Sequence, residues 1–263
     1  MELKQDTVFF GTYKLIDKDI LIKALTDALS LNIKYFDFAE LYKNQDIIGE
    51  FFQNIYKTSK LKRGDFYFTT QVSFRTIIKG EEHIRKSIDK IFVDLQTDYL
   101  DLVLIHAPTK NNILCWNILQ EYKKANKIKN IGISNFNVIE LNNFISEISD
   151  PTEIYCNQIE FNPFLNRKEL IDLCKIKNIK LICYGTLYKT NDFIDSLQEK
   201  YKKTTKQILI QFAIQNGLNP IIMAVQKEHI IEDFNYDGFI IDKEDFDKMN
   251  SYNENYSLYK RYL

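Results

Sequence analysis

Residues 100–106, which read Leu-Asp-Leu-Val-Leu-Ile-His, form an apolar run that stops at a polar residue shortly before Pro108. Such a run, rich in leucine and β-branched residues, is typical of a strand that is buried on both faces in a parallel sheet. Helical patterns lie on either side, since apolar residues recur every three or four positions over residues 81–95 and 114–122. The segment therefore predicts one β-strand between two helices.

The same alternation continues along the chain and gives eight apolar runs separated by helical patterns. The runs are centred on residues 8–11, 33–38, 66–72, 100–106, 129–134, 153–160, 179–184 and 220–225. Eight strands that are each followed by a helix predict an α/β fold, the (β/α)8 TIM barrel. We expect residues 1–263 to form it as a single domain, because no linker rich in proline, glycine or serine divides them.

A doubly wound open sheet is the alternative arrangement for alternating strands and helices. It would not need eight strands, and its first turn would usually be rich in glycine. No such turn follows the first apolar run of this sequence. The barrel is therefore the preferred prediction.

Two helix ends can be placed from the sequence. Asp17 can cap a helix, and Gly217 is suited to the position after the end of a helix that spans residues 205–216. The apolar positions of the first helix follow the 3.6-residue period, and they are Ile20, Leu21, Ala24, Leu25, Ala28 and Leu31.

Composition excludes several classes of function. The 35 basic and 36 acidic residues give a net charge of -1, which argues against a general electrostatic binder of nucleic acid. No apolar run reaches the roughly 18 residues of a membrane span. The first six residues are polar and carry charges of both signs, unlike a signal peptide. We therefore expect a cytoplasmic protein with no membrane or nucleic-acid partner.

The cysteines and histidines indicate neither a disulfide framework nor a metal site. The four cysteines have no C-x-x-C spacing, and reduced intracellular thiols are expected at Cys115, Cys156, Cys174 and Cys183. Only three histidines are present, without the H-x-x-x-H spacing of a metal-binding helix. We expect no metal.

Polar residues stand where several predicted strands end, which is where a barrel of this class carries its active site. Asp37 and Tyr42 follow the second strand, and His106 ends the fourth. Ser134 and Asn135 end the fifth. Gln158 lies near the end of the sixth, and Tyr184 ends the seventh.

In their order and spacing these segments, from Gly11-Thr12 through the eighth strand, resemble the aldo-keto reductases. The resemblance covers nearly the whole chain. It implies hydride transfer from NADPH or NADH to a small carbonyl substrate, an aldehyde or ketone. It also implies that Tyr42 donates the proton, that His106 polarises the carbonyl and that Asp37 belongs to the same polar cluster. A proton donor must hydrogen-bond the substrate oxygen as negative charge develops there.

One catalytic position departs from the family pattern. A free phenol has a pKa near ~10, so a tyrosine acid benefits from a neighbouring cation. The resemblance implies a lysine at the end of the third strand, but this sequence has Gln71 there. Glutamine can hydrogen-bond a phenol but cannot stabilise its anion by charge. Lys43 is a candidate replacement, although adjacent side chains usually point in different directions.

The cofactor side is mixed in the same way. The resemblance implies that Ser134, Asn135 and Gln158 bind the nicotinamide carboxamide and that Tyr184 stacks on its ring. Gly11, Thr12 and Glu232 also match cofactor-binding positions. The family's clamp for the NADPH 2′-phosphate is lost, because Met223, Ala224 and His229 stand at its lysine, serine and arginine positions. The preference for NADPH over NADH is therefore expected to be weakened.

Two functions remain open from the sequence. The first is an NAD(P)H-dependent reductase of small aldehydes or ketones. The second is a catalytically impaired barrel that serves as a cofactor-binding or regulatory protein, as the altered Gln71, Met223, Ala224 and His229 would allow. By analogy with the family, a monomer is expected. The tail after Met249, which carries Tyr252, Tyr256, Tyr259 and Tyr262, is in the position where the family covers its substrate.

Overall fold

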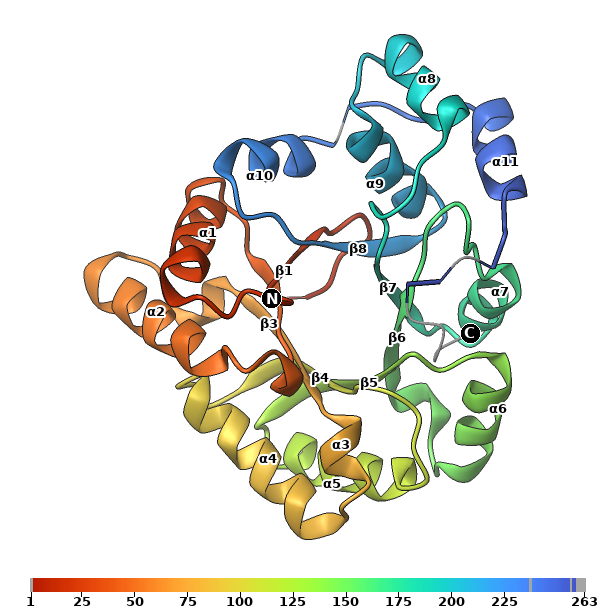
Figure 1. The fold of residues 1–263 in the computed structure, drawn as a ribbon. Coiled ribbons are helices and arrows are strands. Elements are labelled where there is room, and N and C mark those ends of the chain that lie inside the picture. The colour runs from red at the N-terminus through yellow and green to blue at the C-terminus, as the bar shows by residue number, and fades with distance from the viewer. Residues whose placement is uncertain (1, 237, 256, 259–263) are drawn as a thin grey trace.

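Eight parallel strands close into a barrel in the computed structural model, which describes residues 2–236, 238–255 and 257–258. The strands follow one another around the barrel in chain order, and helices surround them on the outside (Figure 1). Closure is made by β1 and β8, where Phe9 pairs with Ile221 and Phe10 with Ile222. The barrel prediction is confirmed, and the open-sheet alternative is wrong.

A helix of the outer layer follows each strand. The strands are β1 (Phe9–Gly11), β2 (Tyr35–Asp37), β3 (Tyr67–Val72), β4 (Leu100–Ile105), β5 (Ile128–Ser134), β6 (Ile154–Glu160), β7 (Lys180–Tyr184) and β8 (Leu218–Ile222). The helices are α1 (Lys18–Ser30), α2 (Gln45–Thr58), α3 (Phe74–Ile77), α4 (Glu81–Asp94), α5 (Asn112–Lys124), α6 (Val138–Glu147), α7 (Lys168–Ile176), α8 (Asp192–Tyr201), α9 (Thr205–Gln215), α10 (Lys227–Phe234) and α11 (Lys243–Ser251).

The eighth strand begins and ends earlier than the sequence predicts. β8 starts at Leu218, and its last residue is Ile222 rather than residue 225. Asn219 explains the missed beginning, because this polar residue is inside the strand and its amide donates to the main-chain oxygens of Lys4 and Thr7. Beyond the strand, Met223 is 42% exposed. An apolar sequence pattern alone therefore placed the strand too late.

The sequence predicts both helix ends correctly, but it wrongly assigns one residue to the buried face of α1. Asp17 caps α1 by accepting from the main-chain N–H of Ile20, and Gly217 follows α9 with a φ of 87°. Ile20 itself is 44% exposed, so it does not belong to the buried face of α1. It lies in the first turn of the helix, at the edge of the contact with the barrel.

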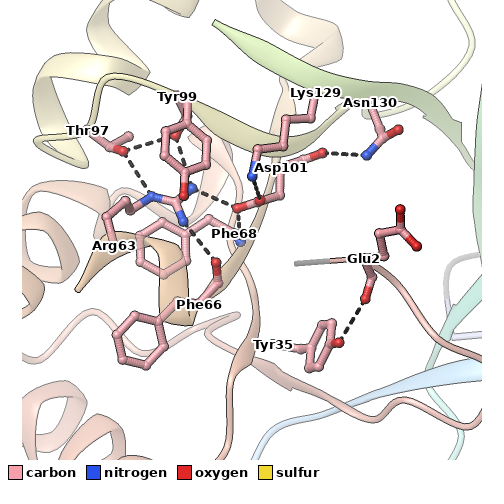
Figure 2. A network of polar contacts seen from close by, with 10 residues as sticks. All are labelled: Glu2, Tyr35, Arg63, Phe66, Phe68, Thr97, Tyr99, Asp101, Lys129 and Asn130. Atoms are coloured by element: carbon pink, nitrogen blue, oxygen red, sulfur yellow. Dashed lines mark hydrogen bonds and ion pairs between the residues drawn. The ribbon is translucent and has the colours of Figure 1, made fainter. Parts of the chain in front are cut away.

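A buried carboxylate joins three strands at the end of the barrel where the strands begin. Asp101 of β4 is fully buried, and it accepts hydrogen bonds from Arg63 and from the main-chain N–H of Phe68. Lys129 of β5 donates to its second oxygen, 2.8 Å away. The Arg63 guanidinium also stacks on the rings of Phe68 and Tyr99, as Figure 2 shows from close by.

Other polar groups complete this end of the barrel. Asn130 donates to the main-chain oxygen of Asp101, and the Tyr35 hydroxyl donates to that of Glu2 (Figure 2). These two hydrogen bonds tie the starts of β5 and β2 to neighbouring segments. The network therefore fixes strand order and register at one end, while the opposite end is left for other chemistry.

Three further expectations can be compared with the described part of the chain. All four cysteines are buried and free of disulfides, as the sequence predicts. No helix there is long and apolar enough to cross a membrane. No group of three or more histidine, cysteine, aspartate or glutamate side chains there could hold a metal ion.

Replacing Asp101 by alanine is expected to lower the free energy of unfolding by about 3–5 kcal/mol, because Arg63 and Lys129 would lose their buried counter-ion. Asp172→Ala is the matched control. It removes an exposed helical ion pair with Lys168 and should cost about 0.5 kcal/mol or less. Urea unfolding at neutral pH measures both. Equal losses in the two variants would contradict a structural role for the Asp101 network.

Candidate active site

A cavity of about 610 Å³ opens at the end of the barrel where the strands terminate. We call it the rim cavity. It is lined by eight residues that the sequence singles out, namely Gly11, Asp37, Tyr42, His106, Asn135, Gln158, Tyr184 and Met223. They come from or directly follow seven of the eight strands, so only a closed barrel brings them together.

Tyr42 is held at the rim by a short turn rather than by a strand. It ends a 3-10 helix, Glu40–Tyr42, whose first residue is fixed by hydrogen bonds to its carboxylate. Glu40 accepts from the main-chain N–H of Ser73 at 2.7 Å and from the Thr76 hydroxyl at 2.6 Å. The Tyr42 ring lies 5.1 Å from that of Tyr13, measured between centroids. These contacts place the phenol at the wall of the rim cavity.

Gln158 links two strands across the mouth of the barrel. Its side-chain nitrogen donates to the Asp37 carboxylate at 2.8 Å, and its side-chain oxygen accepts from the Gln71 amide at 2.9 Å. Gln71 is fully buried and does not line the rim cavity. It therefore acts behind Gln158, where an uncharged amide replaces the lysine that the resemblance implies.

Burial without a cation gives Asp37 an unusual protonation equilibrium. Its side chain is 2% exposed, and no lysine or arginine in the described ranges forms an ion pair with it. Burial raises the pKa of Asp37 to about 7, while the amide hydrogen bonds from Gln158 and Gln71 oppose that rise. The Gln71 side-chain oxygen has no hydrogen-bond donor among the described residues. A protonated Asp37 could satisfy this oxygen after rotation of either group.

His106 is neutral at physiological pH because of its burial. Burial lowers the pKa of its imidazole to about 4. Its ring centroid lies 6.3 Å from that of Tyr42, and its Nδ1 atom has no hydrogen-bond partner within the described segments. A neutral imidazole can donate one hydrogen bond to a ligand oxygen without adding charge to the site.

Asn135 is the centre of a second hydrogen-bonded group. It has a left-handed backbone, with φ of 65°, which asparagine tolerates better than most residues. Its amide nitrogen donates to the main-chain oxygen of His106 and to the Ser134 hydroxyl. Its oxygen accepts from the Tyr184 hydroxyl at 2.6 Å. Ser134 donates in turn to the main-chain oxygen of Gln158, so the ends of β5, β6 and β7 are tied together.

Two of the predicted cofactor residues support the site from behind. Thr12 is fully buried and donates its hydroxyl to the main-chain oxygen of Asp37. Ser134 is also buried, and neither residue lines the rim cavity. A direct contact with a ligand stays a prediction for both.

The sequence reasoning missed a cation at the rim. Lys14, on the loop after β1, lines the rim cavity, whereas Lys43 is exposed and is absent from the lining. The position could have been found, because Lys14 follows the end of a predicted strand in the same way as Tyr42 does. Leu187 and Tyr188, on the loop after β7, also line the rim cavity. The sequence did not indicate them, because they belong to no recognisable motif.

The C-terminal segment reaches the rim through a buried glutamate. Glu160 accepts from the Ser257 hydroxyl and from the main-chain N–H of Leu258, both at 2.6 Å, and Leu258 lines the rim cavity. Tyr252 instead stacks on Phe164, with 5.5 Å between ring centroids. Three other tail residues considered above, Tyr256, Tyr259 and Tyr262, lie outside the described residues.

A second cavity of about 410 Å³ adjoins the first. We call it the side cavity, and it shares Leu187 and Met223 with the rim cavity. The structure places His229 in its lining, together with Ala224, but not in the rim cavity. Glu232 lines neither cavity and instead accepts from Lys206 at 3.2 Å.

Comparison with known proteins gives one family. The model of the aldo/keto reductase family matches residues 7–191, which is more than two thirds of the chain. Glyoxal reductase from Bacillus subtilis is 29% identical, and the match covers 93% of this chain and 87% of the relative. Prostaglandin F synthase 1 from Bos taurus is 25% identical over 95% of this chain and 88% of the relative.

Solved structures agree on the fold. The aldose reductase of Schistosoma japonicum superimposes with a TM-score of 0.88 at 23% identity, covering 96% of this chain and 90% of the other. An aldo-keto reductase solved in complex with NADPH gives a TM-score of 0.86 at 21% identity, covering 95% and 85%. At such identities the likeness is one of fold.

The pKa of Asp37 predicts a specific pH dependence of stability. Between the ordinary value of 3.8 and about 7 the folded protein holds a proton on Asp37 that the unfolded chain has released. Its contribution to stability is therefore full below pH 3.8 and falls, by about 1.4 kcal/mol per pH unit, until the pH exceeds about 7. The variant Asp37→Asn replaces the carboxyl group by an amide of similar shape that does not titrate.

Urea unfolding of both proteins at several pH values between 4 and 9 measures the effect. The difference in unfolding free energy between Asp37→Asn and the parent should grow in favour of the variant as the pH rises through this window. Taking the difference cancels the other titrating groups. A difference that is constant with pH would show that Asp37 is ionised throughout.

Proposed function

Because the chain belongs to the aldo/keto reductase family, we propose that it is an NAD(P)H-dependent oxidoreductase that reduces small aldehydes or ketones. The observation that carries the proposal is the shared lining of the rim cavity. Tyr42 and His106 face the same space as Asn135, Gln158 and Tyr184. The activity named for the glyoxal reductase of Bacillus subtilis, a relative 29% identical, supports a small carbonyl substrate.

The free hydrogen-bonding capacity of the rim fits a nicotinamide carboxamide. Both N–H groups of the Asn135 amide already donate within the protein. Its oxygen accepts one hydrogen bond, from Tyr184, and has a second lone pair that can accept from a ligand amide. Gln158 has one N–H left, and it can donate to a ligand carbonyl. One acceptor and one donor are what a primary amide requires. When bound, the cofactor supplies the hydride.

The size of the cavities agrees with a dinucleotide. Ligand cavities commonly measure roughly 300–1,000 Å³, and a dinucleotide needs an elongated site. The rim cavity and the side cavity together provide one, since they meet at Leu187 and Met223. We propose that the nicotinamide end occupies the rim cavity and the adenosine end the side cavity.

The chain's own residues act on the substrate oxygen in two ways. Neutral His106 donates a hydrogen bond to the carbonyl and so favours the charge that develops there. Tyr42 donates the proton that completes the alcohol. The apolar side chains of Leu41, Leu187 and Leu258 line the same cavity and reduce access of water to these groups.

The alternative function rests on the missing charge. Where the resemblance implies lysine there is Gln71, and Lys14 is the only cation that lines the described part of the rim cavity. The change from lysine to glutamine removes one positive charge that would stabilise the phenolate left after proton transfer. A cofactor-binding barrel with slow catalysis is therefore the second candidate. We favour the enzyme, because the groups that would touch the reacting atoms are present.

Tyr42→Phe is expected to lower kcat by about 10²–10⁴-fold with glyoxal-type or other small carbonyl substrates, because the proton donor is removed. The dissociation constants of NADH and NADPH should stay within about twofold, since no cofactor contact is lost. Tyr13→Phe is the matched control, as this ring packs against Tyr42 and should leave kcat nearly unchanged. Undiminished turnover in Tyr42→Phe, or none in the parent protein with either cofactor, would reject the mechanism.

Gln71→Lys is expected to raise kcat at neutral pH by at least about tenfold. A lysine ammonium at this position would stabilise the phenolate of Tyr42 and ionise Asp37. Gln71→Met, which removes the amide without adding charge, should give no such gain. Steady-state reduction assays on the three proteins measure the effect. An unchanged rate in Gln71→Lys would mean that the missing charge does not limit catalysis.

A further inference from the structure

A single peptide group lies between the turn that carries Tyr42 and the residue that follows β4, His106. It joins Val72, the last residue of β3, to Ser73, and we call it the bridging peptide. Its N–H group, from Ser73, donates to the Glu40 carboxylate at 2.7 Å. Its C=O group, from Val72, accepts from the main-chain N–H of His106 at 3.1 Å. Both hydrogen-bonding groups of one peptide therefore link segments that are far apart in the sequence.

The bridging peptide is shielded from water, since Val72 is fully buried and Ser73 is 2% exposed. A peptide group is planar, and its N–H and C=O point in opposite directions, so fixing one of them fixes the other. A hydrogen bond to a carboxylate is stronger than one between neutral groups, and it polarises the peptide so that its oxygen accepts more strongly. The Glu40 carboxylate therefore helps to hold the main chain of His106 on the opposite side of this peptide.

The helix that begins at the bridging peptide, α3, is held by the same two segments. The Thr76 hydroxyl in α3 donates to the second oxygen of Glu40 at 2.6 Å. At the end of α3, the main-chain oxygen of Ile77 accepts from the Asn111 side chain at 3.0 Å. Asn111 belongs to the loop that leads from His106 to α5. α3 is thus fixed to the turn before it and to the loop after β4.

Glu40 and Tyr42 belong to one short turn, the 3-10 helix Glu40–Tyr42. A turn of this length has few internal hydrogen bonds, so its side-chain contacts decide where it lies. On one side the buried amide of Asn44 donates to the main-chain oxygen of Thr12 at 2.9 Å. On the other side Glu40 holds the bridging peptide. Loss of the Glu40 carboxylate would free the turn on the side where His106 lies.

We propose that Glu40 is a positioning residue that, through the bridging peptide, keeps Tyr42 and His106 placed to reach one carbonyl oxygen together. Glu40 does not line the rim cavity, so it acts through these two residues and not by touching a ligand. Small displacements matter here, because misplacing a reacting group by about 1 Å can cost about 10²-fold in rate. The kinetic effect rests on the proposed reductase function, whereas the bridge itself can be tested without turnover.

The first measurement is amide hydrogen exchange, followed by NMR in the parent protein and in variants. Glu40→Ala should speed exchange at the Ser73 amide, which loses its acceptor. It should also speed exchange at the His106 amide by at least about tenfold, because the peptide that accepts from it is no longer held. The Phe68 amide, which donates to Asp101 near the start of β3, should keep its rate and so controls for global unfolding.

Two further variants separate geometry from the loss of a carboxylate. Glu40→Gln should behave like the parent, because its oxygen can accept from Ser73 and its amide can donate to the hydroxyl oxygen of Thr76. Asp150→Ala is the matched control for Glu40→Ala. Asp150 also accepts from a main-chain N–H and from a threonine hydroxyl, both of Thr152, in the turn before β6. Its loss should change neither the exchange at His106 nor the rate of reduction.

The second measurement is the rate of carbonyl reduction in a double-mutant cycle. Glu40→Ala should lower kcat by about 10–100-fold and leave the dissociation constant of NADH within about twofold. In a Tyr42→Phe background, and likewise in His106→Gln, the same change should lower kcat by about threefold or less. The two losses are then not additive, because Glu40 acts through groups that these variants remove. A purely structural role would lower kcat by the same factor in every background.

The outcomes distinguish the bridge from the proposed function. Faster exchange at Ser73 without faster exchange at His106 overturns the bridge. Equal losses of kcat in all backgrounds overturn the positioning role and leave a reductase intact. Faster exchange at both amides, in a protein whose parent form reduces no carbonyl compound, supports the bridge and rejects the reductase. Glu40→Asp, whose carboxylate is one methylene shorter, gives the same comparison if Glu40→Ala does not fold.

Discussion

The hydrogen bond from Gln158 to Asp37 is the contact on which the candidate site depends. The two residues are separated by 121 positions in the chain and lie on β6 and β2, yet their side chains are 2.8 Å apart. That is possible only because β1 and β8 pair and close the barrel. Gln71 extends the link to β3, so one chain of side-chain hydrogen bonds spans the mouth of the barrel. The positions of Tyr42 and His106 around the same cavity follow from this closure.

Two side-chain amides, those of Gln71 and Gln158, connect to Asp37 across the mouth of the barrel. Because neither amide carries a charge, they determine the electrostatics of the site. A lysine at position 71 would form an ion pair with Asp37 and keep it ionised. With Gln71 there, burial instead raises the pKa of Asp37 to about 7 and lowers that of His106 to about 4. Near neutral pH Asp37 is therefore only partly ionised, and His106 is neutral. Such a site can bind and orient a neutral carbonyl compound well, but it offers little charge to stabilise an anion.

The sequence predicted the architecture because strand periodicity and strand ends are local signals. Eight apolar runs and the residues that terminate them were enough to place Asp37, Tyr42, His106, Asn135, Gln158 and Tyr184 at one end of a barrel. Boundaries were less certain where a polar residue lies within a strand, as Asn219 does in β8.

The sequence predicted three residues that line the side cavity, Met223, Ala224 and His229, but not the charged side chains that join them there. Lys206 belongs to α9 and Asp233 to α10, and neither stands at a strand end or in a motif. Their proximity of 3.5 Å depends on how two helices pack against each other. A local sequence pattern does not determine how two helices pack against each other. The same holds for Leu258, which lines the rim cavity and donates its main-chain N–H to Glu160.

Two buried aspartates lie at opposite ends of the barrel and have different roles. One stabilises the fold, and the other belongs to the candidate site. Asp101 and Asp37 are both nearly inaccessible to water, but Asp101 is paired with Arg63 and Lys129 while Asp37 has only amide partners. A paired buried carboxylate ties strands together through its ion pairs. An unpaired one must gain a proton or a ligand to offset its burial, so its state responds to pH and to binding. The end of the barrel with the paired aspartate is therefore the scaffold, and the end with the unpaired one is where bound molecules can change the protein.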